Sequence, residues 1–142
     1  MKGYLNNWES TTETIDTDSW VHTGDVAIID EAGHYSIVDR IKELIKYNGF
    51  QVPPAELEAL LITHPLIADV AVIGVPDEAV GELPKAFVQL MPGAAVTLDE
   101  VQAFVSEHLV SYKQIRLLEE IDAIPKSASG KILRRELRDA VN

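Results

Sequence analysis

Two mostly apolar runs, 70–75 and 86–90, constrain the fold of this 142-residue chain most strongly. Neither run alternates with polar residues, so each is typical of a buried strand. The polar segment 77–84 separates the two runs. We therefore expect two central strands of one sheet, which the rest of the chain must cover.

Two amphipathic patterns predict the helices that cover this sheet. In residues 55–62 three leucines share one helical face, and the prolines at 53 and 54 suit the first turn. Thr97 and Glu100 have the spacing of a capping box, and apolar residues then recur at helical spacing, at Val101, Phe104, Val105 and Leu109. Together with a last strand over 117–121, these elements indicate a small α+β domain with helices over a short sheet.

The N-terminal third of the chain has a different pattern. Residues 1–19 are polar and lack a sustained apolar period, which predicts an extended arm that does not fold alone. A hairpin is expected where the apolar runs 26–29 and 35–38 flank a turn-forming segment. Tight β-structure is expected again where 43–47 and 50–52 flank Asn48 and Gly49.

Composition excludes several classes of function. The formal net charge is −11, which makes a general attraction to nucleic acid or to an anionic membrane surface unfavourable. The chain has no cysteine, so disulfides, thiolate zinc sites and thiol nucleophiles are excluded, and a reducing cytoplasm is compatible with this composition. The longest mostly apolar stretch is too short to span a bilayer.

A lysine after a small, glycine-containing loop is the first candidate site. Residues 125–131 read PKSASGK, and we expect Lys131 to begin a charged helix that ends near Ala140. Such a loop can approach phosphate closely and the lysine adds a movable positive charge. The segment is not a P-loop, because Pro125 replaces the first glycine and Ile132 replaces the magnesium-binding hydroxyl. A solvated lysine is the simpler interpretation of the loop alone.

Two further polar groups precede the first predicted helix. Asp25 follows a glycine, and Arg40 comes fifteen residues later, a pair suited to holding the hydroxyls of a ribose. An ordinary turn and a surface ion pair explain the same residues. Lys42, Lys46 and Gln51 lie around the Gly49 turn, where lysines could equally protect the edge of a hairpin.

The four histidines have no metal-ligand spacing. His22, His34, His64 and His108 are far apart in sequence and have no cysteine near them, so we interpret them as surface or structural residues. No metal site is predicted.

Three segments, taken in order, resemble the C-terminal portion of the adenylate-forming enzymes, the family of acyl-CoA synthetases, 4-coumarate–CoA ligases and firefly luciferase. Residues 3–25 (GYLNNWESTTETIDTDSWVHTGD) are similar to the end of that family's large N-terminal domain. Residues 38–58 (VDRIKELIKYNGFQVPPAELE) are similar to the segment that joins the two domains, and residues 125–137 (PKSASGKILRREL) to the closing lysine loop. The resemblance covers nearly the whole chain.

The resemblance implies an activity and a division of the chain. The family joins a carboxylic acid to ATP with magnesium, releases pyrophosphate, and passes the acyl group to coenzyme A, while the small domain rotates between the two steps. Residues 1–40 would then be the tail of the large domain with the linker, and 41–142 the C-terminal lid domain. The lid would work against its own N-terminal domain, which would supply the acid pocket and most of the ATP and magnesium site.

The resemblance also implies roles for individual residues. Asp25 would bind the ribose hydroxyls of ATP or AMP with help from Arg40, and Lys131 would reach the carboxylate and phosphate oxygens during adenylation. Lys42 would be the hinge about which the domain rotates.

A second face of the domain would serve thioester formation. Lys46 and Gln51 would lie on this face, with Gly49 shaping the passage for the pantetheine arm of coenzyme A. Asn48 departs from the lysine common at that place in luciferase and many coumarate ligases, and we assign it no catalytic role.

Three functions therefore compete. An acid–CoA ligase is favoured, because the segment IKELIKYNGFQ resembles the CoA-ligase and luciferase branches more than the adenylation domains of peptide synthetases. A luciferase-like or carrier-protein-loading adenylase is the second, and a non-catalytic nucleotide-binding fragment is the third. We expect the chain alone to be inactive.

Overall fold

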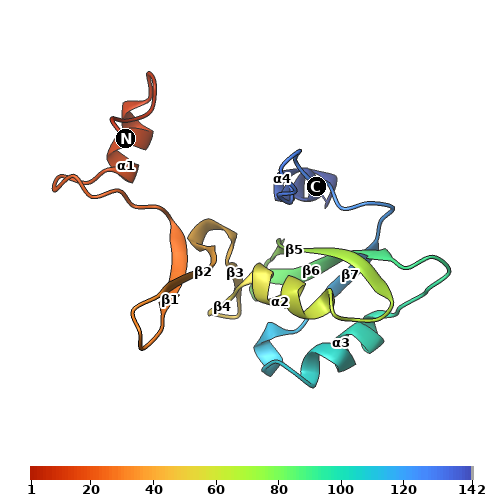
Figure 1. Ribbon diagram of the computed structural model, residues 1–142. Coiled ribbons are helices and arrows are strands. Elements are labelled where there is room, and N and C mark those ends of the chain that lie inside the picture. The colour runs from red at the N-terminus through yellow and green to blue at the C-terminus, as the bar shows by residue number, and fades with distance from the viewer. Residues whose placement is uncertain (142) are drawn as a thin grey trace.

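The computed structural model describes residues 1–141, so Asn142, the end of the expected lid domain, lies outside the described residues. Four α-helices, two short 3₁₀ helices and seven strands follow one another in the order α1 (Trp8–Thr14), β1 (Asp25–Ile29), β2 (Tyr35–Arg40), η1 (Ile41–Glu43), β3 (Ile45–Tyr47), β4 (Phe50–Val52), α2 (Pro54–Leu61), β5 (Ile67–Asp77), β6 (Gly81–Leu90), α3 (Leu98–Ser106), η2 (Ser111–Lys113), β7 (Leu117–Glu120) and α4 (Arg134–Val141) (Figure 1). No helix within residues 1–141 is long and apolar enough to cross a membrane.

A five-stranded sheet forms the centre of the domain. Its strands have the order β4-β3-β6-β5, and β7 pairs in parallel with β6. The two apolar runs predicted as strands lie in β5 and β6, which form one long antiparallel hairpin in which Val72 faces Ala86. The predicted α+β fold is therefore confirmed.

Two details of the predicted strands are wrong. β5 lies at the edge of the sheet and is not central, because no strand within residues 1–141 pairs with its second edge. The segment 77–84 is not a separate polar connection: β5 continues to Asp77 and β6 begins at Gly81, so three residues form the turn. An apolar run indicates that both faces of a strand are buried. Layers of side chains above and below a sheet can bury both faces of an edge strand as well as those of a central strand.

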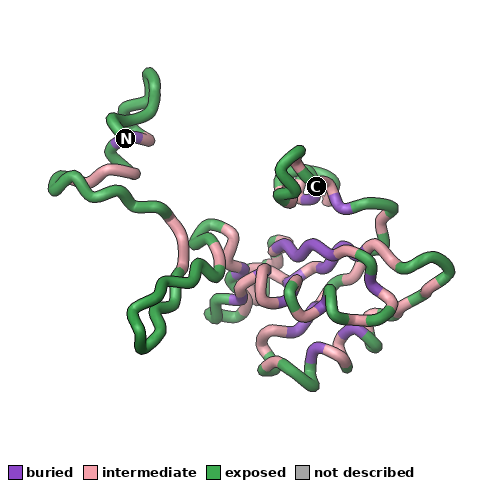
Figure 2. The backbone as a smooth tube through the Cα atoms, viewed as in Figure 1, coloured by how far each residue is buried: buried purple, intermediate pink, exposed green. Residues whose placement is uncertain are grey.

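The core consists of two layers on opposite faces of this hairpin. Val70 and Val72 face α2 and α3 in the larger cluster, whereas Ala71 and Ile73 face the smaller cluster that contains Leu137 of α4. Because side chains alternate between the faces of a strand, a strand covered on both sides has no polar alternation. Figure 2 shows the buried positions concentrated in this hairpin and in the helices beside it.

The predicted helices form with one shift in position. α2 begins at Pro54, and α3 begins after Thr97, whose capping box with Glu100 is complete. The last helix begins at Arg134 and not at Lys131. Residues 126–132 form a closed turn instead, in which Lys126 bridges Ile132 and the Ser127 N–H donates to the Lys131 carbonyl. These backbone groups are therefore committed to the turn, and the helix can start only after it.

The N-terminal arm extends away from this domain (Figure 1). The arm is not wholly extended as predicted, because Asn7 caps the short helix α1 by accepting a hydrogen bond from Ser10 N. Thr11 is the only buried residue among residues 1–40. The two predicted hairpins are present as β1–β2 and β3–β4, although Glu43 belongs to the 3₁₀ turn η1 and not to a strand.

Candidate functional site

The loop that carries Lys131 is a short, tightly closed turn. The Ser127 N–H donates to the Lys131 carbonyl at 2.8 Å, the Lys131 N–H donates to Ser127 Oγ at 3.2 Å, and the Gly130 N–H donates to the Ser127 carbonyl. Gly130 has a φ of +81°, a conformation that glycine adopts without the steric cost that a side chain would bring. The glycine before the lysine is therefore required by the geometry of the turn.

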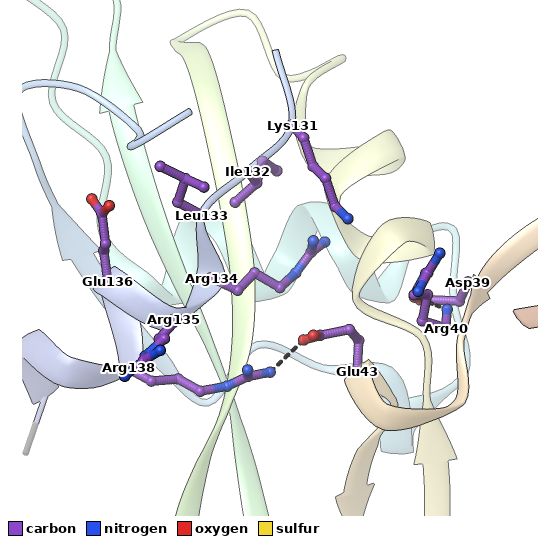
Figure 3. Close-up of a pocket in the computed structure, with 10 residues that line it drawn as sticks. All are labelled: Asp39, Arg40, Glu43, Lys131, Ile132, Leu133, Arg134, Arg135, Glu136 and Arg138. Atoms are coloured by element: carbon purple, nitrogen blue, oxygen red, sulfur yellow. Dashed lines mark hydrogen bonds and ion pairs between the residues drawn. The ribbon is translucent and has the colours of Figure 1, made fainter. Parts of the chain in front are cut away.

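The Lys131 side chain lies at a cavity of about 390 Å³ between α4, with the residues just before it, and the segment that runs from the end of β2 into η1. Figure 3 shows Lys131 on one side of this cavity and Asp39 and Arg40 on the other. The walls are strongly charged and are formed by Asp39, Arg40, Glu43, Lys131, Ile132, Leu133, Arg134, Arg135, Glu136 and Arg138. Two predicted site residues from opposite ends of the chain, Arg40 and Lys131, thus meet at one cavity.

Asp25 and Arg40 face each other across the β1–β2 hairpin. They are register partners, and Arg40 Nε lies 3.1 Å from Asp25 Oδ1. The arginine side chain is 60% exposed and the aspartate side chain 21% exposed, so the guanidinium stays accessible while one carboxylate oxygen is engaged. The two side chains therefore form an ion pair, which is the simpler interpretation given above, and their role in holding a ribose stays a prediction.

Asp39, the residue before Arg40, contacts the first α-helix of the domain. Its Oδ2 accepts a hydrogen bond of 3.2 Å from the N–H of Ala55, in the first turn of α2, and its Oδ1 accepts one from Arg40 N. A carboxylate at a helix N-terminus satisfies a free N–H and complements the helix dipole. Asp39 therefore fastens the end of β2 to the N-terminus of α2.

Lys46, Gln51 and Gly49 form a second group on the β3–β4 hairpin. Lys46 and Gln51 are register partners, so their side chains lie on one face of the hairpin. Asn48 and Gly49 have φ values of +49° and +81°, as a two-residue turn with two left-handed positions requires. None of these residues belongs to the wall of the Lys131 cavity. The predicted site residues thus fall into two separate groups.

Lys42 lies between these two groups. It occupies the exposed 3₁₀ turn η1, which connects the β1–β2 hairpin with β3. The adjacent Glu43 forms an ion pair with Arg138 of α4, shown as a dashed line in Figure 3. One end of the connecting segment is therefore held to α4.

A partly buried charged pair, which the sequence did not reveal, lies at the edge of β5. Arg134 Nη2 donates to both carboxylate oxygens of Glu58 at 2.7 Å, and both side chains are at most 16% exposed. Burial raises the pKa of Glu58, opposed by the hydrogen bond from Val72 N and by the positive charge of Arg134. The segment LRREL offered only a weak signal, a run of charges that is ordinary on the surface of a helix.

The histidines are peripheral, as predicted. His22 and His34 are exposed and contact Asp16 and Asp30, whereas His64 and His108 contact the ring of Phe104. Within residues 1–141, no three His, Asp or Glu side chains come together in a group that could hold a metal ion.

Comparison with known families identifies the domain. The model of the AMP-binding enzyme C-terminal domain matches residues 56–131, which is more than half of the chain and includes both Glu58 and Lys131.

The chain belongs to this family.

The relatives of this chain include plant ligases. The chain is 59% identical over 139 residues to a 4-coumarate–CoA ligase of Glycine max, and the match covers 97% of this chain and 47% of that protein. It is 56% identical over 138 residues to a 4-coumarate–CoA ligase of Narcissus pseudonarcissus, covering 97% of this chain and 25% of that protein. The chain thus spans between a quarter and a half of the length of these relatives.

A solved structure has the same arrangement of arm and domain. The ATP-bound MatB of Rhodopseudomonas palustris superposes with a TM-score of 0.90 at 32% identity, over 98% of this chain and 28% of the MatB chain. The superposition includes residues of the arm as well as those of the AMP-binding enzyme C-terminal domain. The lid fold expected from the sequence is therefore confirmed.

Proposed function

We propose that this chain is the C-terminal part of an ATP-dependent, AMP-forming carboxylic acid–CoA ligase. In the first half-reaction, a carboxylate oxygen of the acid attacks the α-phosphorus of ATP, and pyrophosphate leaves to give an acyl-adenylate. In the second, the thiol of coenzyme A attacks the acyl carbon, and AMP leaves as the thioester forms. Residues 1–40 belong in this proposal to the N-terminal domain and the linker, and 41–142 to the lid.

One observation carries the proposal. Lys131 and Arg40, which lie ninety-one residues apart in sequence, face the same cavity in a chain that superposes on an ATP-bound protein. A lysine held there by a short turn can place its ammonium against negative charge that grows on the carboxylate and phosphate oxygens in the transition state. Asp25 would accept hydrogen bonds from the ribose hydroxyls while Arg40 assists.

Residues 1–141 do not form a site that fits magnesium. The described residues contain no group of three acidic or histidine side chains of the kind a bound ion needs. We therefore assign no step of the lid's chemistry to the metal, which would come with ATP.

The β3–β4 hairpin would serve the second half-reaction. Lys46 and Gln51 share one face of it, and the Asn48–Gly49 turn leaves no side chain at residue 49 to obstruct a pantetheine arm. In this proposal Lys42 is the hinge of a rotation that replaces the Lys131 loop at the site with this hairpin.

A luciferase-like or carrier-protein-loading enzyme would share the first half-reaction but would not need coenzyme A. A cytoplasmic location stays a prediction.

The test separates the two half-reactions in the full-length enzyme. The acid used is 4-coumarate, the substrate named for the relatives that are 56–59% identical. Lys131→Ala should slow ATP–pyrophosphate exchange by about 100-fold or more, because it removes a positive charge that is needed as the adenylate forms. Thioester formation from supplied coumaroyl-adenylate and coenzyme A should change little.

The matched control is Lys126→Ala. Lys126 lies in the same loop, but its ammonium pairs with Asp69 and does not belong to the cavity wall. Lys126→Ala should slow ATP–pyrophosphate exchange much less than Lys131→Ala does. Equal losses in both half-reactions for Lys131→Ala would contradict the assigned role, and adenylation without any dependence of the second step on coenzyme A would favour the other adenylases.

A further inference from the structure

The open edge of β5 is closed by two side chains where a neighbouring strand would otherwise pair. At Val72 the N–H donates to Glu58 Oε1 at 2.8 Å, and the carbonyl accepts from Arg134 Nε at 3.4 Å. Both backbone groups point away from β6, and a pair of charged side chains satisfies them. Glu58 and Arg134 then close the arrangement through the two hydrogen bonds between them.

This arrangement joins three elements through side-chain hydrogen bonds. Glu58 belongs to α2 on one face of the sheet, Val72 to the edge strand, and Arg134 to the first turn of α4 on the other face. The group is mostly buried, so water screens the pair weakly and each partner depends on the other. The first turn of α4 is thereby fixed to the sheet.

Arg134 lies only three residues after Lys131. Between them the backbone is held at Leu133, whose N–H donates to the Pro125 carbonyl at 2.9 Å, and by Ile132, which bridges Lys126. The Lys126–Asp69 ion pair at the start of the lysine loop is more exposed to water and contributes little, so the firm anchor of the loop is Arg134 at its end. Figure 3 shows the Lys131 and Arg134 side chains leaving adjacent parts of the chain toward the same cavity.

We propose that Glu58 and Arg134 are positioning residues for Lys131: together with Val72 they form a clamp at the edge of β5 that fixes where the lysine loop meets the cavity. The inference rests on the proposed role of Lys131 in adenylation. A preorganised charge accelerates a reaction only when it is held where charge develops, and small displacements are costly. Glu58 does not line the cavity, so its effect on adenylation must pass through other groups.

The first test measures the loop itself in the full-length enzyme. Glu58→Gln removes the negative charge but keeps a side-chain oxygen that can accept from Val72 N, so the fold should survive. Hydrogen exchange of the backbone amides in residues 127–133 should become at least several-fold faster, because the clamp that limits local opening is weakened. Unchanged exchange in these residues would overturn the proposal whatever the role of Lys131.

The second test measures the half-reactions of the same enzyme with 4-coumarate. Glu58→Gln and Arg134→Ala should lower pyrophosphate exchange by roughly 10-fold to 100-fold. Thioester formation from supplied coumaroyl-adenylate should stay near the unmodified rate. Arg134→Lys should recover part of the loss, because an ammonium can pair with Glu58 but lacks the planar guanidinium that reaches both Glu58 and the Val72 carbonyl from two different nitrogens.

The matched control is Glu56→Gln, on the same helix. Glu56 pairs with Lys113 on the other side of the domain, away from the lysine loop, and its removal should leave adenylation unchanged. If Glu58→Gln lowered the rates of both half-reactions equally, together with the melting temperature, the pair would be purely structural and the proposal would be overturned. Normal adenylation in Glu58→Gln with slow adenylation in Lys131→Ala would also overturn it, whereas normal adenylation in Lys131→Ala would refute the proposed function instead.

Discussion

At the scale of single residues, two carboxylates in this chain respond to their surroundings in opposite directions. Burial raises the pKa of Glu58 above its ordinary value of 4.5, whereas hydrogen bonds from the backbone and hydroxyl of Thr97 lower the pKa of the exposed Glu100. A raised pKa means that the folded chain holds the proton more tightly than the unfolded chain. Ionisation of Glu58 therefore lowers the stability of the fold as a whole, because desolvation outweighs the pairing with Arg134 that holds the ionised carboxylate in place, and ionisation of Glu100 favours the fold.

We predict opposite pH dependences for Glu58→Gln and Glu100→Gln. The stability of the unmodified chain relative to Glu58→Gln should fall as pH rises above 4.5 through the folded pKa, and then stay level. The stability of the unmodified chain relative to Glu100→Gln should be constant above pH 4.5. This stability difference should be lost as the pH falls below 4.5 through the lowered pKa of Glu100 in the folded chain. Urea unfolding of the chain over a pH series measures both differences. The same sign for both variants would contradict the assigned environments.

At the scale of elements, the N-terminus of α3 is a defined contributor to stability. Thr97 Oγ1 accepts from Glu100 N, and Glu100 Oε2 accepts from Thr97 N at 2.8 Å, so each residue satisfies a free backbone donor of the other. Thr97→Ala should lower the free energy of unfolding by about 1 kcal/mol. Chemical denaturation measures this loss. Ser106→Ala, at the other end of the helix, should cost less, because its hydroxyl donates to the carbonyl of Ala103 and satisfies no free N–H.

The turn η1 carries the prediction about domain rotation. Rotation of one rigid domain needs a large dihedral change at a few residues, and proline fixes φ near about −65°. In a full-length enzyme, Lys42→Pro should spare pyrophosphate exchange and strongly reduce thioester formation, because rotation is needed after the adenylate has formed. The two half-reactions and the melting temperature should be measured together. Normal rates for both in a folded variant would show that Lys42 is not the hinge.

At the scale of the whole molecule, the chain divides into a part with a core and a part without one. The buried hydrophobic residues begin at Ile45, whereas the arm exposes large side chains such as Leu5, Trp8 and Trp20, at 73% or more. Several aromatic and aliphatic side chains of the β1–β2 hairpin are exposed as well, including Tyr35 and Ile37. Apolar surface on this scale is typical of a segment that packs against another domain.

We therefore predict that the isolated chain folds only in part and does not activate an acid. Hydrogen exchange should be slow in β5, β6 and α2 and fast throughout residues 1–40, because backbone hydrogen bonds without a core open easily. The purified chain should release no more pyrophosphate from ATP and 4-coumarate than its Lys131→Ala variant. Strong protection in residues 8–14, or pyrophosphate release above that background, would show that the arm or the site is more complete than we infer.

Local patterns in the sequence were sufficient for the elements and for several site residues. The capping box at Thr97, the Asn48–Gly49 turn and the two apolar strands depend on interactions within a few residues or on simple burial, so they were predictable. The resemblance of three segments selected Lys131, Asp25 and Arg40, and the structure brings Asp25 and Arg40 into contact. The roles of these residues, and the two-domain division, stay predictions.

Only the tertiary structure decided which distant groups meet. The apolar pattern of β5 could not show that it is an edge strand, because two covering layers produce the same pattern as two neighbouring strands. The start of α4 moved to Arg134, since a closed turn takes the backbone groups around Lys131. Glu58 and Arg134 are seventy-six residues apart, and nothing local to either predicts the other. The sequence by itself determined what each segment can form, because those preferences are short-range; the pairing of buried charges across the sheet edge depends on the packing of three elements, which exists only in the folded chain.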